Sequence, residues 1–201
     1  MNAQGKRSGE TAREYAYRMI REQVISLELK PGEAFNDMEF AAKIGVSRTP
    51  VREAVIQLSE ESRIIEIFPQ RGMRIAPIDV ELVEEARSLR VLLEKQIAGM
   101  CCEMATEEDI KWLQENVGLQ EFYMENSRPE MVMQLDDEMH HKLFMICHRE
   151  LTYGMCQKLA IHYDRIRSLS VNTVKDNTII EDHRKIIQFI AEHKKENAMA
   201  Q

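Results

Sequence analysis

The positions of the residues that interrupt helices constrain this fold most strongly. The chain has only five prolines and eight glycines, and most of them fall before residue 79. The later ones are Gly99, Gly118, Pro129 and Gly154. Long helices are therefore expected only in the second part, while the first part must consist of short elements. We predict a mainly α fold with two domains, residues 1–78 and 79–201.

The first domain is predicted to contain three helices followed by a hairpin. Apolar residues at three- and four-residue spacing predict a helix that ends before Pro31 and a short second helix over residues 37–44. Gly45 stands where a helix C-terminus needs a left-handed residue, and a third helix follows it. Two apolar runs, residues 64–68 and 73–76, predict the two strands of the hairpin.

The second domain is predicted to be an all-helical bundle. Its apolar residues recur at helical spacing in five successive stripes, and no repeat or low-complexity segment interrupts them. The stripes cover residues 82–100, 110–117, 131–146, 151–169 and 179–190.

The charge distribution keeps a nucleic-acid partner open for the first domain. The net charge of −7 argues against such a partner only if the charge is evenly spread. Residues 1–78 carry 12 basic and 11 acidic side chains, whereas residues 79–201 carry 15 and 23, so the acidity belongs to the second domain. No apolar run is long enough to span a membrane and no segment is of signal-peptide type, so we expect a cytoplasmic protein. The four cysteines lack Cys-x-x-Cys spacing and are predicted to be reduced core residues.

Residues 41–54 have the build of a helix-turn-helix with DNA-binding groups at the start of its second helix. The hydroxyls of Ser47 and Thr49, together with backbone N–H groups at a helix N-terminus, can hold phosphate. Arg48 and Arg52 share one helix face, and each has a guanidinium fork that pairs bidentately with guanine. The alternative is that both arginines are solvated surface charges and Ser47 is only a helix cap.

The same segment resembles a known family. Residues 47–54 are close to the signature of GntR-type bacterial transcriptional regulators, and residues 30–33, 58–61 and 70–73 are similar to other parts of that family's DNA-binding domain. The resemblance implies a winged helix-turn-helix in which the recognition helix and the tip of the wing touch DNA. The residues that it implicates are Ser47, Arg48, Thr49, Arg52, Arg71 and Gly72.

Two positions depart from that pattern. Met38 stands where many relatives carry an arginine, which implies one phosphate contact fewer. Ser62 replaces a common glycine before the first wing strand, which implies a slightly altered entry into the wing.

The second domain resembles the helical, FCD-type effector domain of the FadR-like GntR subfamily. The similarity rests on residues 90–94, 135–143 and 181–186, and with the first domain it covers about residues 11–195. It implies a protein that binds both a DNA operator and a small effector.

Three polar residues of the second domain are candidate metal ligands. Asp136 and His140 lie four residues apart beside an apolar stripe, and His183 lies on another stripe. Inward polar groups are costly unless they are paired, hydrogen-bonded or ligated. The spacing alone leaves open two core histidines satisfied by neighbours, with the aspartate at the edge of the surface.

The resemblance implies that these three residues hold a divalent metal ion, with a fourth ligand from the last helix. That ligand is absent here because the chain stops at Gln201, and His193 points about 80° away from the direction of His183. Either the chain is truncated at its C-terminus, or water or the effector completes the site. Imidazole and carboxylate ligands suit zinc, nickel or manganese.

Arg90 is the candidate for pairing a carboxylate of the effector, and an intrahelical pair with Glu94 is the equal alternative. Tyr163 and Arg167, four residues apart, are further candidates for lining the same pocket.

The leading functional hypothesis is a ligand-responsive transcriptional regulator that binds a pseudo-palindromic DNA operator as a homodimer and senses a small carboxylate. The first alternative is a metal-dependent enzyme built on Asp136, His140 and His183, which is disfavoured because the chain has no His-Glu-x-x-His motif and no Gly-rich phosphate loop. The second alternative is a truncated regulator that binds DNA but is defective in sensing.

Overall fold

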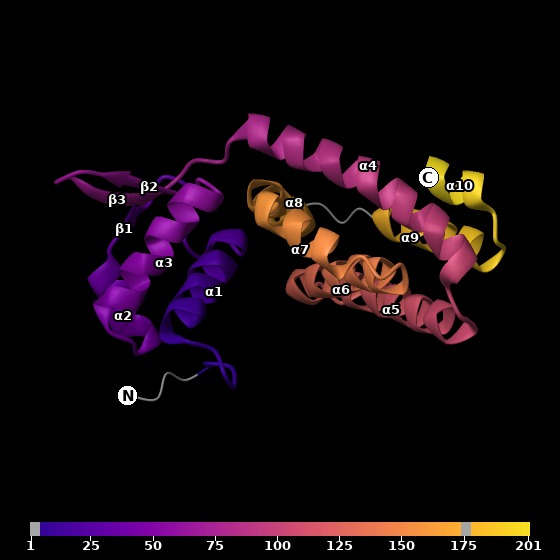
Figure 1. The fold of residues 1–201 in the computed structure, drawn as a ribbon, viewed down its shortest axis with the longest axis horizontal. Coiled ribbons are helices and arrows are strands. Elements are labelled where there is room, and N and C mark those ends of the chain that lie inside the picture. The colour runs from indigo at the N-terminus through magenta and orange to yellow at the C-terminus, as the bar shows by residue number, and fades with distance from the viewer. Residues whose placement is uncertain (1–4, 174–177) are drawn as a thin grey trace. The chain divides into compact units, whose positions relative to one another are not determined.

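The computed structural model describes residues 5–173 and 178–201, which form two compact units (Figure 1). The first unit ends at Val83 and also includes residues 158–165; the second consists of residues 84–157 and 166–201. Helices dominate both units, and one small sheet belongs to the first. The prediction of a mainly α protein is confirmed.

The first unit has the predicted order of three helices and a hairpin, with one additional strand. Its elements are α1 (Ala12–Ile25), β1 (Ala34–Phe35), α2 (Asp37–Ile44), α3 (Arg48–Glu61), β2 (Ile65–Phe68) and β3 (Gly72–Ile75). Strand β1 pairs antiparallel with β3, so that Phe35 lies opposite Met73 and the sheet order is β1-β3-β2. The predicted two-stranded wing was therefore incomplete, because a two-residue strand has no periodicity to detect.

The turn between α2 and α3 follows from local chemistry. The side chain of Asn36 caps α2 by accepting a hydrogen bond from the backbone N–H of Met38. At the other end Gly45 has φ 72°, a left-handed conformation that glycine adopts without the steric cost of a Cβ atom. The buried face of α3 then joins the core, which it reaches through Val51, Ala54, Val55 and Leu58. The opposite face of α3 is left exposed.

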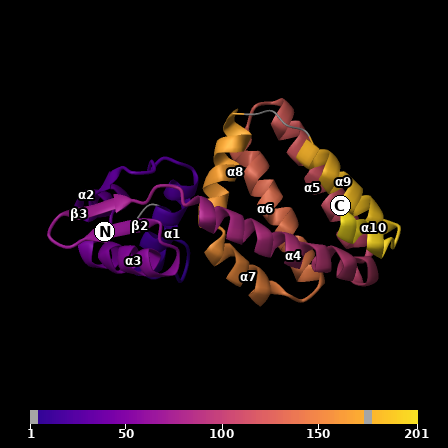
Figure 2. The ribbon, with the colours of Figure 1, turned by 90° about the horizontal axis from the view of Figure 1, so that it is seen from above.

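The second unit is a helical bundle. Its helices are α4 (Val80–Met104), α5 (Glu107–Glu125), α6 (Pro129–Ile146), α7 (Glu150–Leu159), α8 (Ile161–Thr173), α9 (Thr178–Ala191) and α10 (Lys195–Ala200). The first residues of α4 and α8 and the last two residues of α7 are assigned to the first unit. Helix α5 contacts both α6 and α9, and Figure 2 shows α5 and α9 running beside each other. One core cluster includes Leu113, Val117, Met139, Phe144 and Ile187.

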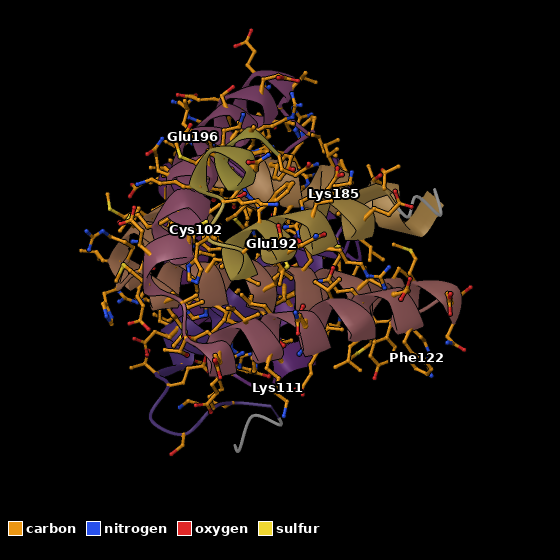
Figure 3. All side chains as sticks on the ribbon, turned by 90° about the vertical axis from the view of Figure 1, so that its right-hand side faces the viewer. Cys102, Lys111, Phe122, Lys185, Glu192 and Glu196 are labelled. Carbon is orange, nitrogen blue, oxygen red and sulfur yellow. The ribbon has the colours of Figure 1, made fainter. Side chains whose placement is uncertain are left out.

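Helix α10 covers the C-terminal part of α4. Figure 3 shows Glu196 of α10 above the segment of α4 that carries Cys102, and Lys195 of α10 donates a hydrogen bond of 2.6 Å to the carboxylate of Glu103. At Gly99 the side chain of Met199 packs against the backbone of α4, and a Cβ atom there would lie 2.8 Å from the sulfur of Met199, so that side chain would have to shift. The four cysteines are buried free thiols, as predicted.

The prediction of a single helix from the stripe over residues 151–169 was wrong. The chain forms two helices there, α7 and α8, which are separated at Ala160. Three residues of the stripe, Leu151, Met155 and Leu159, are 81%, 63% and 55% exposed. Helical spacing identifies an apolar face, but it does not reveal what covers that face. No described helix has the length and apolar character needed to cross a membrane.

Candidate functional site

The N-terminal turn of α3 presents the predicted DNA-binding residues on one exposed surface. Ser47 occupies the N-cap position, but its hydroxyl makes no capping hydrogen bond, and the first turn contains no acidic residue. The positive end of the helix dipole and the orphan N–H groups are therefore not neutralised by the helix itself. Arg48, Thr49 and Arg52 are exposed beside it. This turn has the chemistry of a phosphate-binding surface.

Arg48 is held by a buried carboxylate. Its Nε atom donates a hydrogen bond of 3.0 Å to Oδ2 of Asp37, the first residue of α2, whose side chain is almost fully buried. This contact leaves the terminal nitrogens of Arg48 without a hydrogen-bond partner among the described residues, and these are the atoms that reach a base or a phosphate. Asp37 was not among the residues singled out from the sequence, although its place in the first turn of α2, eleven residues before Arg48, is a detectable signal.

The tip of the wing is formed by the turn between β2 and β3. Gln70 and Gly72 both have positive φ, 62° and 99°, and the backbone N–H of Arg71 donates to the carbonyl of Phe68. Arg71 and Gly72 are exposed at this tip, as predicted. Arg74, further along β3, is instead paired with Glu66. Arg71 is thus the basic side chain that the tip presents.

The three predicted metal ligands lie together in the second unit. One ligand atom from each of Asp136, His140 and His183 lies within 4.8 Å of the others. Asp136 and His140 come from α6, and His183 comes from α9. The Nε2 atoms of His140 and His183 lie 3.8 and 3.5 Å from carboxylate oxygens of Asp136. The side chain of Asp136 is only 13% exposed, so it does not lie at the edge of the surface as the alternative interpretation required.

Asp136 remains ionised in this enclosed position because a guanidinium lies against it. Burial raises the pKa of Asp136, but the charge of Arg167, with smaller contributions from the neighbouring imidazoles and Arg90, outweighs that effect and brings the pKa to about 2. Arg167 of α8 is the strongest partner, since its guanidinium binds Asp136 and also lies 2.9 Å from Asp137. Arg167, a weak candidate from the sequence, is therefore an integral part of the cluster.

His183 is neutral and held by an amide. Burial lowers the pKa of His183 to about 4, and the field of Asp136 offsets this effect only in part. Its Nδ1 atom lies 3.1 Å from Oε1 of Gln120, which belongs to α5. Gln120 donates to Asn116, and Asn116 donates to the carbonyl of Leu135. Gln120 and Asn116 were missed in the sequence, yet their signal is visible: two amides four residues apart that interrupt the apolar stripe of α5.

His140 is less tightly held than His183. Its Nδ1 atom is buried and lies 3.3 Å from a carboxylate oxygen of Glu94, but it forms no hydrogen bond with any described residue. Glu94 in turn accepts a hydrogen bond of 2.9 Å from Nε of Arg90, so the predicted intrahelical pair is present. Arg90 also lies close enough to lower the pKa of Asp136. An unpartnered imidazole nitrogen, a second imidazole and a carboxylate form a donor set that fits a divalent transition metal.

Comparison with known proteins agrees with this geometry. Residues 12–75 match the family of bacterial regulatory proteins called the gntR family, and residues 85–201 match the FCD domain. The chain belongs to the GntR family of bacterial regulatory proteins. It is similar to the transcriptional repressor RspR of Escherichia coli K12, with 30% identity over 158 residues that cover 79% of this chain and 69% of the repressor.

Further relatives support the same assignment. A transcriptional regulator from an unstable DNA locus of Streptomyces ambofaciens is 30% identical over 190 residues, which cover 92% of this chain and 78% of that protein. The structure of McbR/YncC from E. coli superposes with a TM-score of 0.81 at 18% identity over 94% of this chain and 91% of that one, which shows a shared fold. The GntR-family chain is therefore a DNA-binding transcriptional regulator, and the enzyme hypothesis is not supported.

The position of Arg167 in this GntR-family protein leads to a stability prediction. Replacing it with glutamine (Arg167→Gln) leaves the enclosed carboxylate of Asp136 with less compensation, and we expect the free energy of unfolding to fall by about 2–3 kcal/mol. Urea unfolding of the metal-free protein, followed by circular dichroism, measures the change.

The matched control is Arg184→Gln. Arg184 pairs with Glu121, but both side chains are close to half exposed, so its loss should cost about 0.5 kcal/mol or less. Equal effects of the two substitutions would contradict the role assigned to Arg167.

Proposed function

We propose that this GntR-family regulator binds a pseudo-palindromic operator as a homodimer and that a small carboxylate controls it through the helical domain. Residues 1–78 act as the DNA-binding domain, and residues 79–201 bind the effector and form the dimer. Its action on chromosomal DNA places it in the cytoplasm. The observation that carries the proposal is the exposed, acid-free first turn of α3, which presents Ser47, Arg48, Thr49 and Arg52.

In the DNA complex the side chains divide into two roles. The hydroxyls of Ser47 and Thr49 and the N–H groups of the α3 N-terminus contact phosphate and set the position of the helix. Arg48 and Arg52 read base edges in the major groove, and Arg48 does so from an orientation fixed by Asp37. Arg71, with Gly72 allowing a close approach of the backbone, enters the minor groove.

The first test is DNA binding by the variant Arg52→Ala. We expect it to bind a palindromic site from the region upstream of its own gene about 10- to 100-fold more weakly than the parent protein, because a bidentate base contact is lost. Fluorescence anisotropy at a fixed salt concentration measures the affinity. The control Arg87→Ala removes the same charge from an exposed position of α4 and should leave binding unchanged. A parent protein with no preference for any palindromic site over random DNA would contradict the proposal.

A second copy of the chain is the proposed occupant of the apolar face of α7. Two recognition helices are needed to read two half-sites, and a symmetric dimer supplies them. Leu151, Met155 and Leu159 follow one another at four-residue spacing and are mostly exposed, which is costly for a surface that faces only water. We name these three residues the α7 stripe.

Sedimentation equilibrium tests the dimer. The parent protein should have about twice the mass of one chain, and the double variant Leu151→Glu, Met155→Glu should be monomeric because it places two like charges in each half of the interface. The control Phe122→Glu changes an exposed apolar residue of α5 and should remain dimeric. A monomeric parent, or a dimer unaffected by both glutamates, would show that the α7 stripe is not the interface.

A divalent metal ion is the proposed cofactor, held by Asp136, His140 and His183. Zinc, nickel and manganese suit these ligands. When bound, the ion supplies a Lewis-acidic centre that accepts the carboxylate oxygens of an effector. Arg90 lies beside the cluster and is the cation that pairs with the effector's remaining charge, in exchange for its contact with Glu94. Binding that favours one arrangement of the bundle over another then biases DNA binding.

Metal analysis tests this site. Purified protein should contain about one divalent ion per chain by plasma mass spectrometry, and His140→Ala and His183→Ala should each lose it. The control His141→Ala should retain the ion, because His141 stacks on Tyr153 and is not one of the three clustered ligands.

Small chelating carboxylates should then raise the thermal midpoint of the metal-loaded parent more than that of Arg90→Gln. A metal-free parent, or a variant His140→Ala that keeps its ion, would overturn the metal site.

A further inference from the structure

The side chains of Asn116 and Gln120 form a buried chain of hydrogen bonds that runs in one direction only. Both residues lie on α5 and are 4% and 1% exposed. Nδ2 of Asn116 donates to the carbonyl oxygen of Leu135 over 3.1 Å, and Nε2 of Gln120 donates to Oδ1 of Asn116 over 2.8 Å. The last link joins Oε1 of Gln120 to Nδ1 of His183 over 3.1 Å.

The direction of this chain is fixed by its first member. A backbone carbonyl can only accept, so Asn116 must turn its NH2 group towards Leu135 and its oxygen towards Gln120. Gln120 must then donate its own NH2 group to that oxygen, which leaves its oxygen facing His183. Reversing either amide would bring two acceptor oxygens together inside a buried site, where an unmade hydrogen bond is destabilising.

The orientation of the Gln120 amide determines which ring nitrogen of His183 carries the proton. Because Gln120 offers only an acceptor, Nδ1 of His183 carries the proton of this hydrogen bond, and in the neutral ring Nε2 then carries the lone pair. Nε2 is the atom that lies 3.5 Å from Oδ1 of Asp136. We infer that Gln120, oriented by Asn116, is a positioning residue that sets the tautomer of His183 so that its Nε2 lone pair faces a divalent cation beside Asp136.

His140 provides the contrast. Among the described residues the Nδ1 atom of this other imidazole makes no hydrogen bond, although it lies 3.3 Å from a carboxylate oxygen of Glu94, so no hydrogen-bonded amide orients this ring. The inference rests on the proposed metal site, and it adds that one ligand is arranged before any ion arrives while the other is not. A ligand that is already oriented loses less conformational freedom on binding.

The first experiment measures the tautomer of His183 in the metal-free parent protein. Histidine labelled with 15N gives separate nitrogen signals for the two neutral tautomers, and the His183 signals are assigned by their loss in His183→Gln. We expect the Nδ1–H form at pH 8. An Nε2–H form would overturn the inference.

The second experiment compares Zn²⁺ affinity among variants by competition with a chromogenic chelator. Gln120→Leu removes the acceptor, and we expect binding about 10- to 100-fold weaker, together with loss of the pure Nδ1–H signature. Gln120→Glu keeps an acceptor at the same place and should retain the Nδ1–H tautomer. Asn116→Leu frees the Gln120 amide to reverse, and it should give a mixture of tautomers with an intermediate affinity.

A buried neighbour controls for simple destabilisation. Val117 is 2% exposed on the same helix, so Val117→Ala should lower stability without changing the tautomer or the Zn²⁺ affinity. If the parent binds Zn²⁺ and Gln120→Leu binds it equally well, the role of Gln120 is overturned while the metal site stands. If the parent binds no Zn²⁺, the metal site and this role are both overturned.

Discussion

One enclosed carboxylate organises the helical unit. Asp136 lies among α6, α8 and α9, where an isolated charge would be prohibitively costly, and so positive or polar partners converge on it from each of these helices. Arg167 supplies the compensating charge, and the two imidazoles add hydrogen-bonding capacity without adding a permanent charge. A divalent ion beside Asp136 would also compensate its negative charge, so Arg167 and a metal ion would stabilise the same carboxylate.

In the winged helix the important feature is a helix N-terminus that no local group neutralises. Two other helices, α1 and α5, begin with capping boxes, formed by Thr11 with Glu14 and by Thr106 with Asp109. The N-terminus of α3 has neither a capping side chain nor an acidic first turn. Its stability comes instead from a fully buried apolar face packed in the core. Because the buried face stabilises α3, the N-terminus of this helix remains available to a negatively charged partner.

The sequence was sufficient for the elements that short-range rules determine. The bounds of α2 and the left-handed conformation of Gly45 follow from capping and steric preferences that act within a few residues. Strand β1 was missed because it exists only through pairing with β3, about forty residues later in the chain. The break between α7 and α8 was missed because the apolar spacing continues across it. Local patterns carry no information about such partners.

The candidate site shows the same limit. The positions of Asp136, His140 and His183 suggested a common site, and the fold brings them together. Their surroundings could not be predicted, because Arg167 and Gln120 reach them from helices that are distant in the sequence. Asn116 and Gln120 were detectable only as polar interruptions of an apolar stripe, and spacing does not say which partner such an amide has.

The amide chain also ties three helices together. Its acceptor, the carbonyl of Leu135, belongs to the residue directly before Asp136, so hydrogen bonds lead from α6 through Asn116 and Gln120 of α5 to His183 of α9, whose Nε2 atom lies 3.5 Å from Asp136. A sliding of α6 or α9 against α5 would have to break one of these hydrogen bonds. The chain therefore fixes the register of the three helices, and because coupling is reciprocal, whatever tightens the cluster must also resist that sliding.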